Sequence, residues 1–152
     1  MPTDLSEFLA QSDAVLEALT AGWEGPLRPA SEEILTQYAL VQQIRFDEEG
    51  YGEWPPLTPG TLRRKAEAGY PPWILVATGF LRGSLQIGGP ENIFQIGQFE
   101  MYYGTEVVYA EKHQYGDYPT PIRTILIDAD DAMEEWAAQL LGNRLAEIAS
   151  SI

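Results

Sequence analysis

The sequence contains no cysteine and a single histidine, His113. Without thiols, neither a disulfide framework nor a thiolate metal site can form. Any metal site would have to be rich in carboxylates, and Glu111, His113 and Asp117 do not have a recognised ligand spacing. We therefore expect no metal and no cofactor. We interpret His113 as a structural histidine that bonds a neighbouring backbone group or carboxylate, with a ligand or general base as the less favoured alternative.

Cationic side chains are scarce. Nine Lys and Arg stand against 23 Asp and Glu, which gives a net charge of −14 and a pI near 4.2. Such a chain repels nucleic acid at long range, and this argues against a surface that grips phosphates. A protein of this charge that meets DNA would line its path rather than hold it.

A signal peptide and long apolar runs are also missing. The N-terminus lacks a basic start and an apolar core, and no apolar run approaches the ~20 residues of a membrane span. We expect a protein without a membrane partner, kept in the cytoplasm until it joins a larger object. With 45% hydrophobic and 21% charged residues, the chain is expected to form one globular domain over residues 1–152.

Helical periodicity is strong at both ends of the chain. Asp4 and Glu7 have capping-box spacing, and residues 4–20 predict an amphipathic helix. Ser31 is expected to cap a second helix, and Asp128 a long C-terminal helix. The apolar stripe of the C-terminal helix comprises Met133, Trp136, Ala137, Leu140, Leu141, Leu145 and Ile148.

Short apolar segments between the helices predict strands at 85–87, 93–96, 99–103 and 122–127. Their short connections imply an antiparallel meander with one face covered by helices, and a further short helix is expected over 107–115. The predicted fold class is α+β. It has a small antiparallel sheet of three to four strands packed by helices, with long N-terminal and C-terminal helices.

The stretch from Glu53 to Leu85 is the most informative part of the chain. Thr58 followed by Pro59 predicts the start of a short helix, and Gly69 predicts its end. A pair of prolines then holds the chain extended. Thr78 is expected to cap a second short helix.

Large apolar side chains in this region have little local core to cover them. Tyr51 and Trp54 make the acidic loop before the stretch a candidate contact arm, and Tyr70 to Trp73 is a second exposed segment. Trp54 and Leu57 are expected to anchor the stretch, either on the sheet or on a neighbouring molecule.

Arg63, Arg64, Lys65 and Arg82 form the only cationic cluster of the sequence. Two interpretations stay open. The cluster is either a solvated helix face that balances nearby carboxylates, or a contact patch for an acidic surface of a neighbouring copy.

Two blocks of motifs follow one another in a fixed order. The first contains W-x-P-L from Trp54, T-P-x-T-L-x-x-K from Thr58 and I-L-x-x-T-G-x-L-x-x-S from Ile74. The second contains Gly104-Thr105, Val108-Tyr109-Ala110, His113-Gln114-Tyr115-Gly116 and Pro121-x-Arg123. This order resembles the phage virion morphogenesis family, which includes tail-completion proteins of tailed bacteriophages. The family usually has Pro-Ala-Arg-Pro-Phe where this chain has Pro121-Ile122-Arg123-Thr124-Ile125.

The resemblance implies a non-enzymatic structural protein of the phage neck. It would complete or terminate the tail and join it to the head connector as a homo-oligomeric ring, expected to be a hexamer. The implied partners are other copies, the tail-tube protein and the neck or connector proteins, with DNA passing through the channel without specific binding. The implied location is the tail or neck of the virion, after synthesis in the host cytoplasm. The candidate interface or motif residues are Tyr51, Trp54, Leu57, Arg63, Arg64, Lys65, Tyr70, Trp73, Arg82, Tyr109, His113 and Arg123.

The alternative is a small acidic ligand-binding domain or a hydrolase that uses the aromatic, Pro-rich stretch as a pocket wall. Such a site needs polar groups that converge around an apolar cleft, and the sequence does not supply a recognisable set. Ser84 lacks a G-x-S-x-G context, and the segment from Thr78 to Ser84 lacks the Gly-Lys pair of a phosphate loop. The acidic residues after Asp128 are interpreted as a favourable helix N-terminus rather than a cation site.

The charge gives a direct prediction for DNA. The purified protein should show no measurable binding to duplex DNA even at low ionic strength, where cationic contacts would be strongest. An electrophoretic or fluorescence-anisotropy titration at decreasing salt concentration checks this. Binding that strengthens steeply as salt is removed would contradict it.

Overall fold

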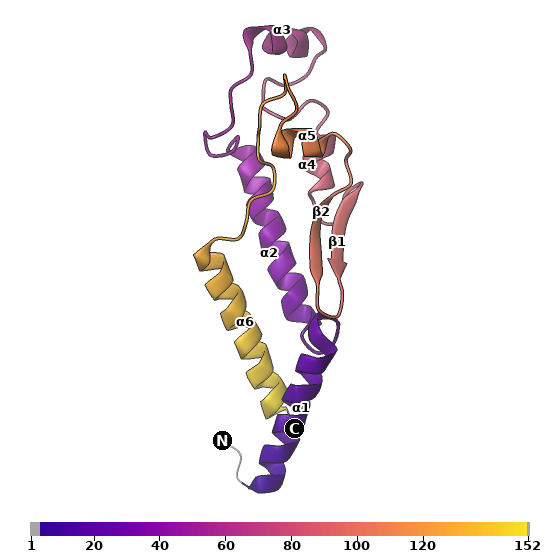
Figure 1. The fold of residues 1–152 in the computed structure, drawn as a ribbon, viewed down its shortest axis with the longest axis vertical. Helices are drawn as coiled ribbons and strands as arrows, with labels where there is room; N and C mark the ends of the chain where they lie inside the picture. Colours follow the sequence, from indigo (N-terminus) through magenta and orange to yellow (C-terminus); the bar gives the residue numbers. More distant parts are fainter. Residues whose placement is uncertain (1–3, 152) are drawn as a thin grey trace. The chain divides into compact units, whose positions relative to one another are not determined.

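The computed structural model describes residues 4–151. In this part of the chain it contains six α-helices, one 3₁₀-helix (η1, Gly22–Glu24) and a two-stranded antiparallel sheet (Figure 1). The α+β class is therefore confirmed. The chain divides into two compact units. The first contains residues up to 36 together with 95–102 and the segment from 129 onward, and the second contains 37–94 and 103–128. A single domain over 1–152 stays a prediction.

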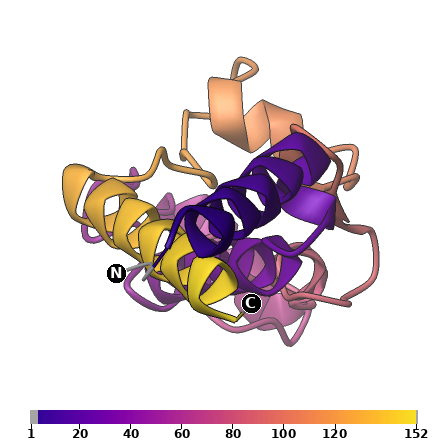
Figure 2. The same ribbon diagram turned by 90° about the horizontal axis from the view of Figure 1, so that it is seen from below.

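In the first unit, helices α1 (Leu5–Ala21) and α6 (Asp131–Ser150) pack against each other (Figure 2). The predicted cap of α1 is confirmed, because the Asp4 carboxylate accepts the backbone N–H of Glu7 at 2.9 Å. Ala18 of α1 is fully buried. The predicted apolar stripe of α6 is half-buried along its length, and the helix runs through Gly142 without interruption.

Two helices begin at positions other than those predicted. Helix α2 (Arg28–Asp47) starts before Ser31, whose buried hydroxyl donates to the Leu27 carbonyl at 3.1 Å and so does not act as a cap. Pro29 lies in the first turn, where its missing N–H costs nothing. Helix α6 is capped by Asp130 rather than Asp128. The Asp130 carboxylate accepts the N–H of Met133 at 2.8 Å. The predicted cap was displaced because several nearby acidic residues could each cap this helix.

The second unit contains α3 (Pro59–Glu67), α4 (Phe80–Ser84) and α5 (Ala110–Tyr115). Thr58 caps α3 as predicted, accepting the N–H of Thr61 at 3.2 Å, and Gly69 follows the helix with a left-handed φ of 75°. The cap of α4 is Gly79, one residue after the predicted Thr78, although the Thr78 hydroxyl accepts the N–H of Phe80 at 3.3 Å. Helix α5 is shorter than the predicted 107–115.

Strands β1 (Asn92–Ile96) and β2 (Met101–Thr105) form the sheet. The predicted third and fourth strands are absent from the described residues. At 85–87 the chain turns, because carbonyls of α4 accept the N–H groups of Leu85 and Gln86 at 3.2 and 3.1 Å. At 122–127 the backbone is bonded mainly by side chains, as shown below.

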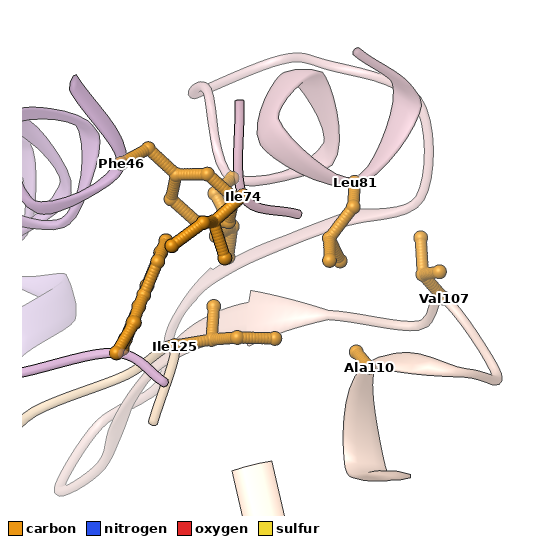
Figure 3. Packing of buried hydrophobic residues seen from close by; sticks show 8 residues of the cluster. Phe46, Ile74, Leu81, Val107, Ala110 and Ile125 are labelled. Carbon is orange, nitrogen blue, oxygen red and sulfur yellow. The ribbon is translucent and has the colours of Figure 1, made fainter. Parts of the chain in front are cut away.

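One hydrophobic core organises the second unit (Figure 3). Leu85 and Ile125 are its most enclosed members, at 0% and 1% exposed. The core draws on α2, α4, α5 and the loops between them, because the small sheet alone cannot bury an apolar layer. Its members are Phe46, Trp54, Ile74, Leu81, Leu85, Val107, Ala110 and Ile125.

No helix in residues 4–151 is both long enough and apolar enough to cross a membrane.

The acidic loop after α2 is shaped around Trp54. Gly50 and Gly52 both have left-handed φ angles, of 72° and 77°. A Cβ atom on Gly50 would lie 2.5 Å from the Trp54 indole, whereas a Cβ on Gly52 would meet nothing within 4 Å. Gly50 is thus required by packing as well as by backbone geometry.

This difference gives a matched pair of variants. Gly50→Ala and Gly52→Ala should each cost about 1 kcal/mol from left-handed strain. Gly50→Ala should cost a further 1–3 kcal/mol or so, because the indole must move. Urea unfolding of the two variants and the wild type measures the difference. Equal losses would show that the loop does not depend on the Trp54 contact.

Candidate functional site

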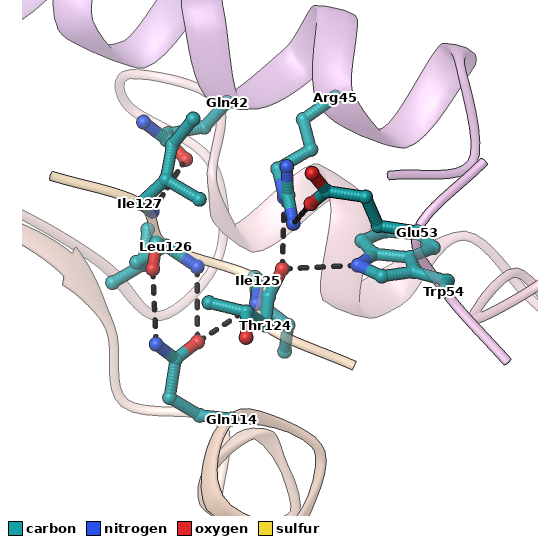
Figure 4. A network of polar contacts seen from close by, with 9 residues as sticks. All are labelled: Gln42, Arg45, Glu53, Trp54, Gln114, Thr124, Ile125, Leu126 and Ile127. Carbon is teal, nitrogen blue, oxygen red and sulfur yellow. Dashed lines mark hydrogen bonds and ion pairs between the residues drawn. The ribbon is translucent and has the colours of Figure 1, made fainter. Parts of the chain in front are cut away.

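Residues 123–127 form an extended segment of the second unit with no strand beside it in the described part of the chain. Side chains bond its backbone instead (Figure 4). Gln114 Oε1 accepts the N–H groups of Ile125 at 2.7 Å and Leu126 at 3.0 Å, and Gln114 Nε2 donates to the Leu126 carbonyl at 2.9 Å. One glutamine therefore supplies the acceptor and donor that a neighbouring strand would otherwise provide.

Helix α2 supplies a second set of bonds to the same segment. Gln42 Oε1 accepts the N–H of Ile127 at 3.2 Å, and the Tyr38 hydroxyl donates to the carbonyl of Ile127. Arg45 Nε donates to the Thr124 carbonyl at 2.9 Å. Because Tyr38, Gln42 and Arg45 are four and three residues apart, they share one face of α2. The 123–127 segment is thus held from two sides.

Trp54 completes this arrangement. Its Nε1 donates to the Thr124 carbonyl at 3.0 Å, and its ring packs edge-on against Phe46 with centroids 5.3 Å apart. Leu57 packs against the same core. Both residues therefore anchor the central stretch within the chain. Trp54 is only 4% exposed, which corrects its assignment to an exposed contact arm, whereas Tyr51 is 53% exposed.

Arg123 connects the two motif blocks. Its guanidinium is buried and donates to the carbonyls of Pro55 at 2.9 Å and Pro56 at 3.3 Å. Burial lowers the pKa of Arg123 from its usual value. The two blocks that carry the family resemblance therefore meet through a cation that bonds the backbone.

Lys65 has a similar part in the first block. Its Nζ donates to the carbonyls of Trp73 and Val76, each at 2.6 Å, and so holds this stretch beside α3. Burial lowers the pKa of Lys65, opposed by the nearby charge of Glu49. The side chains of Tyr70 and Trp73 stay exposed, at 43% and 59%.

His113 is half-buried, and its ring lies edge-on to that of Tyr109 with centroids 6.4 Å apart. Within residues 4–151 its side chain makes no hydrogen bond, and Nδ1 is buried without a partner. The predicted bond to a backbone group or carboxylate is therefore wrong, and the ring is held by packing. Burial, and then the charge of Arg123, lower the pKa of His113 below its usual 6.5.

The nine cationic side chains have three kinds of surroundings. Lys65 and Arg123 donate to carbonyls, while Arg63 and Arg64 are the only two in the described chain with neither an ion pair nor a bond to a carbonyl. The predicted cluster is thus divided among different roles, since Arg82 pairs with Asp47 at 2.7 Å. The cations in ion pairs are Arg28, Arg45, Arg82, Lys112 and Arg144.

The described residues contain no group of three or more His, Asp or Glu side chains that could hold a metal ion. Ser84 is fully buried, and its hydroxyl is bonded to the Leu81 carbonyl and the Thr105 hydroxyl, both at 2.7 Å. Ser84 is therefore not positioned to attack a substrate.

A cavity of about 870 Å³ opens beside α2 and α4 in the second unit. Phe46, Trp73 and Val76 supply apolar walls. Its charged lining consists of Asp47, Glu48, Glu49 and Arg82.

Several of the residues that hold the 123–127 segment were not among the predicted site residues. Gln42 and Arg45 lie on the apolar side of α2, in line with Tyr38. A polar residue inside an apolar helical stripe is a signal for a buried hydrogen bond. The sequence analysis included Gln114 only as part of the His113-Gln114-Tyr115-Gly116 motif and did not predict its hydrogen bonds.

A scan against protein-family models, a search of curated proteins and a search of solved structures each found no match to this chain. The resemblance to the virion morphogenesis family therefore stays a prediction based on motif order.

The Gln114 bonds can be tested by removing their polar atoms at nearly constant volume. Gln114→Met leaves two N–H groups and one carbonyl without partners, which should cost roughly 3 kcal/mol or more. Gln86→Met is the matched control, because Gln86 is exposed and its side chain makes no hydrogen bond within residues 4–151, so its effect should stay within about 0.5 kcal/mol. Chemical denaturation of both variants gives the comparison, and equal stabilities would contradict the assigned role.

His113 gives a pH prediction. Its lowered pKa means that below about pH 6.5 the unfolded chain binds more protons than the folded chain. This contribution to stability is complete above the unfolded pKa and is lost as pH falls toward the lower folded pKa. His113→Gln should remove that part of the pH dependence. Urea unfolding near pH 7.5 and 5.5 measures it, and because His113 is the only histidine, parallel losses in both proteins would refute the prediction.

Proposed function

We propose that this chain is a non-enzymatic structural protein of a bacteriophage neck. It completes or terminates the tail and joins it to the head connector as a closed ring of identical copies, expected to number six. Its other partners are the tail-tube protein and the neck or connector proteins. The order of the two motif blocks supports this family assignment.

One observation carries the non-enzymatic part of the proposal. The polar motif side chains Lys65, Gln114 and Arg123 are bonded to the chain's own backbone. An enzyme needs convergent polar groups that face a substrate, whereas these groups fix irregular loops in one shape. Rigid loops suit a protein whose activity is to present surfaces to several partners.

Exposed apolar side chains support an assembly role. Val108, Tyr115 and Tyr118 are 88%, 72% and 98% exposed. Apolar surface on this scale is typical of proteins that bind other proteins.

The charge is consistent with a channel through which DNA moves. A net charge of −14 is multiplied around a ring, and the carboxylates either line the channel or face basic partner surfaces. We favour an acidic channel, because departing DNA would then meet no cationic trap.

The 870 Å³ cavity favours a second candidate, a ligand-binding domain. Its volume lies within the usual range for ligand sites, about 300–1,000 Å³. Its lining contains no Ser, His or Lys, so it suits binding of a cationic ligand better than hydrolysis.

Mass measurement separates the two candidates. Native mass spectrometry of the purified protein, alone and with tail-tube protein, should show a ring of six chains. A cryo-electron microscopy map of the virion neck should place that ring between tail and connector. A strictly monomeric protein, or a neck map with one or two copies per virion, would overturn the ring, and saturable ligand binding in the cavity would then favour the second candidate.

A further inference from the structure

The first helix presents an apolar stripe to solvent, interrupted only by Ser12. Leu5, Phe8, Leu9, Leu16 and Leu19 recur at helical spacing on one face of α1. Each is between 51% and 71% exposed. The largest apolar side chains of the helix are therefore exposed to water, which is unfavourable for them.

Helix α6 does not cover the stripe. The opposite face of α1 carries small residues, with Ala18 fully buried and Ala10, Ala14 and Ala21 half-buried, and α6 packs against α1. Small side chains allow close approach of two helices. The stripe is thus left for a partner outside the first unit.

Its size is sufficient for a specific interface. The five side chains expose roughly 500 Å² together, at the upper end of the largest apolar patch on a typical monomer. A stable interface buries about 800 Å² on each partner, so the stripe with its rim can supply one side.

Charge decides what kind of partner fits. Asp13 lies between Leu9 and Leu16 on the helix surface, and Glu17 follows one turn later. Both are exposed, and they line a shallow hollow of about 470 Å³ with Leu16, Thr20, Ala21 and Gln98. Helix α1 has no Lys or Arg, so a second α1 packed against it would bring like charges together. A partner with cations beside apolar groups is favoured.

The same chain carries such a surface. Arg63 and Arg64 on α3 are its only cations without an ion pair or a carbonyl partner in the described residues. None of the residues of α3 is buried, and Leu62 is 39% exposed. Lys65 holds the stretch that carries the exposed Trp73 beside this helix.

We propose that α1 of one copy docks on the α3 surface of the next copy, with Asp13 and Glu17 facing Arg63 and Arg64. We define the α3 surface as Leu62, Arg63, Arg64, Tyr70 and Trp73. Because the two patches differ, the contact is head-to-tail, and repetition of such a contact builds a ring when the rotation between neighbouring copies closes. This inference rests on the ring proposed above and names the surfaces that build it.

Charge reversal tests the electrostatic part. The variants Asp13→Arg/Glu17→Arg and Arg63→Glu/Arg64→Glu should each need at least tenfold more protein to assemble. Mixing the two should restore assembly, because the opposite pairing is re-established. Glu33→Arg/Glu135→Arg is the control for the α1 variant, since it changes the net charge by the same amount and in the same direction. Both sites are exposed and make no side-chain hydrogen bond or ion pair within residues 4–151, so this control should assemble normally. Native mass spectrometry reads out each sample.

Cross-linking tests the geometry, and the absence of native cysteine makes it specific. Leu16→Cys and Leu62→Cys are made in separate full-length chains and treated with a short bismaleimide. The mixture should give cross-linked dimers, and neither variant alone should do so.

The outcomes distinguish this contact from the ring itself. If both charge-reversal variants still assemble normally, the α1–α3 contact is wrong but the proposed ring is retained. The same holds if the mixed Cys variants form rings without a cross-link. Self-cross-linking of the Leu16→Cys chain alone would establish a symmetric α1 pair and overturn the contact. A wild-type protein that never assembles overturns both.

Discussion

The backbone of residues 123–127 lies beside a packed core, with no neighbouring strand among the residues that the structure describes, and this constraint shapes the second unit. Ile125 is 1% exposed, so the peptide groups on either side of it need partners within the protein. Gln114 meets this need from α5, and Gln42 and Arg45 meet it from α2. The position of both helices is thereby tied to one short piece of irregular chain.

Cations in this acidic protein act mainly on its own backbone and carboxylates. Arg123 bonds the carbonyls of Pro55 and Pro56, and Lys65 bonds those of Trp73 and Val76. A charged donor makes a stronger hydrogen bond than a neutral one, and it tolerates loops that lack regular pairing. Proline-rich segments especially need such help, since prolines cannot donate backbone bonds of their own.

Local signals in the sequence were sufficient for much of the helical structure. The caps at Asp4 and Thr58 were predicted because Glu7 follows Asp4 at capping-box spacing and Pro59 directly follows Thr58. The start of α6 was displaced because Asp128, Asp130 and Asp131 offer competing caps. The strand expected at 122–127 was wrong for another reason. An apolar run predicts burial, but it does not reveal which distant groups will bond the backbone. The candidate site shows the same limit. Trp54 is buried through its contacts with Phe46 and Thr124, which are distant from the motif in one or the other direction. Lys65 and Arg82 differ from Arg63 and Arg64 because they bond the carbonyl of Trp73 and the carboxylate of Asp47, and the cluster itself does not reveal these partners.

The long-range bonds around residues 123–127 also bear on how the second unit is synthesised. The Tyr38–Ile127 and Arg45–Thr124 bonds join residues 89 and 79 positions apart, and the Trp54–Thr124 bond joins residues 70 apart. Contacts between such distant residues form late, because the loop between them must first be closed. Until residues 123–127 have emerged from the ribosome, the side chains of Tyr38, Gln42 and Arg45 on α2 therefore lack these bonding partners. A nascent chain that has not yet emerged past Ile127 lacks the segment that completes this unit, so the second unit cannot finish folding before residues 123–127 have left the ribosome.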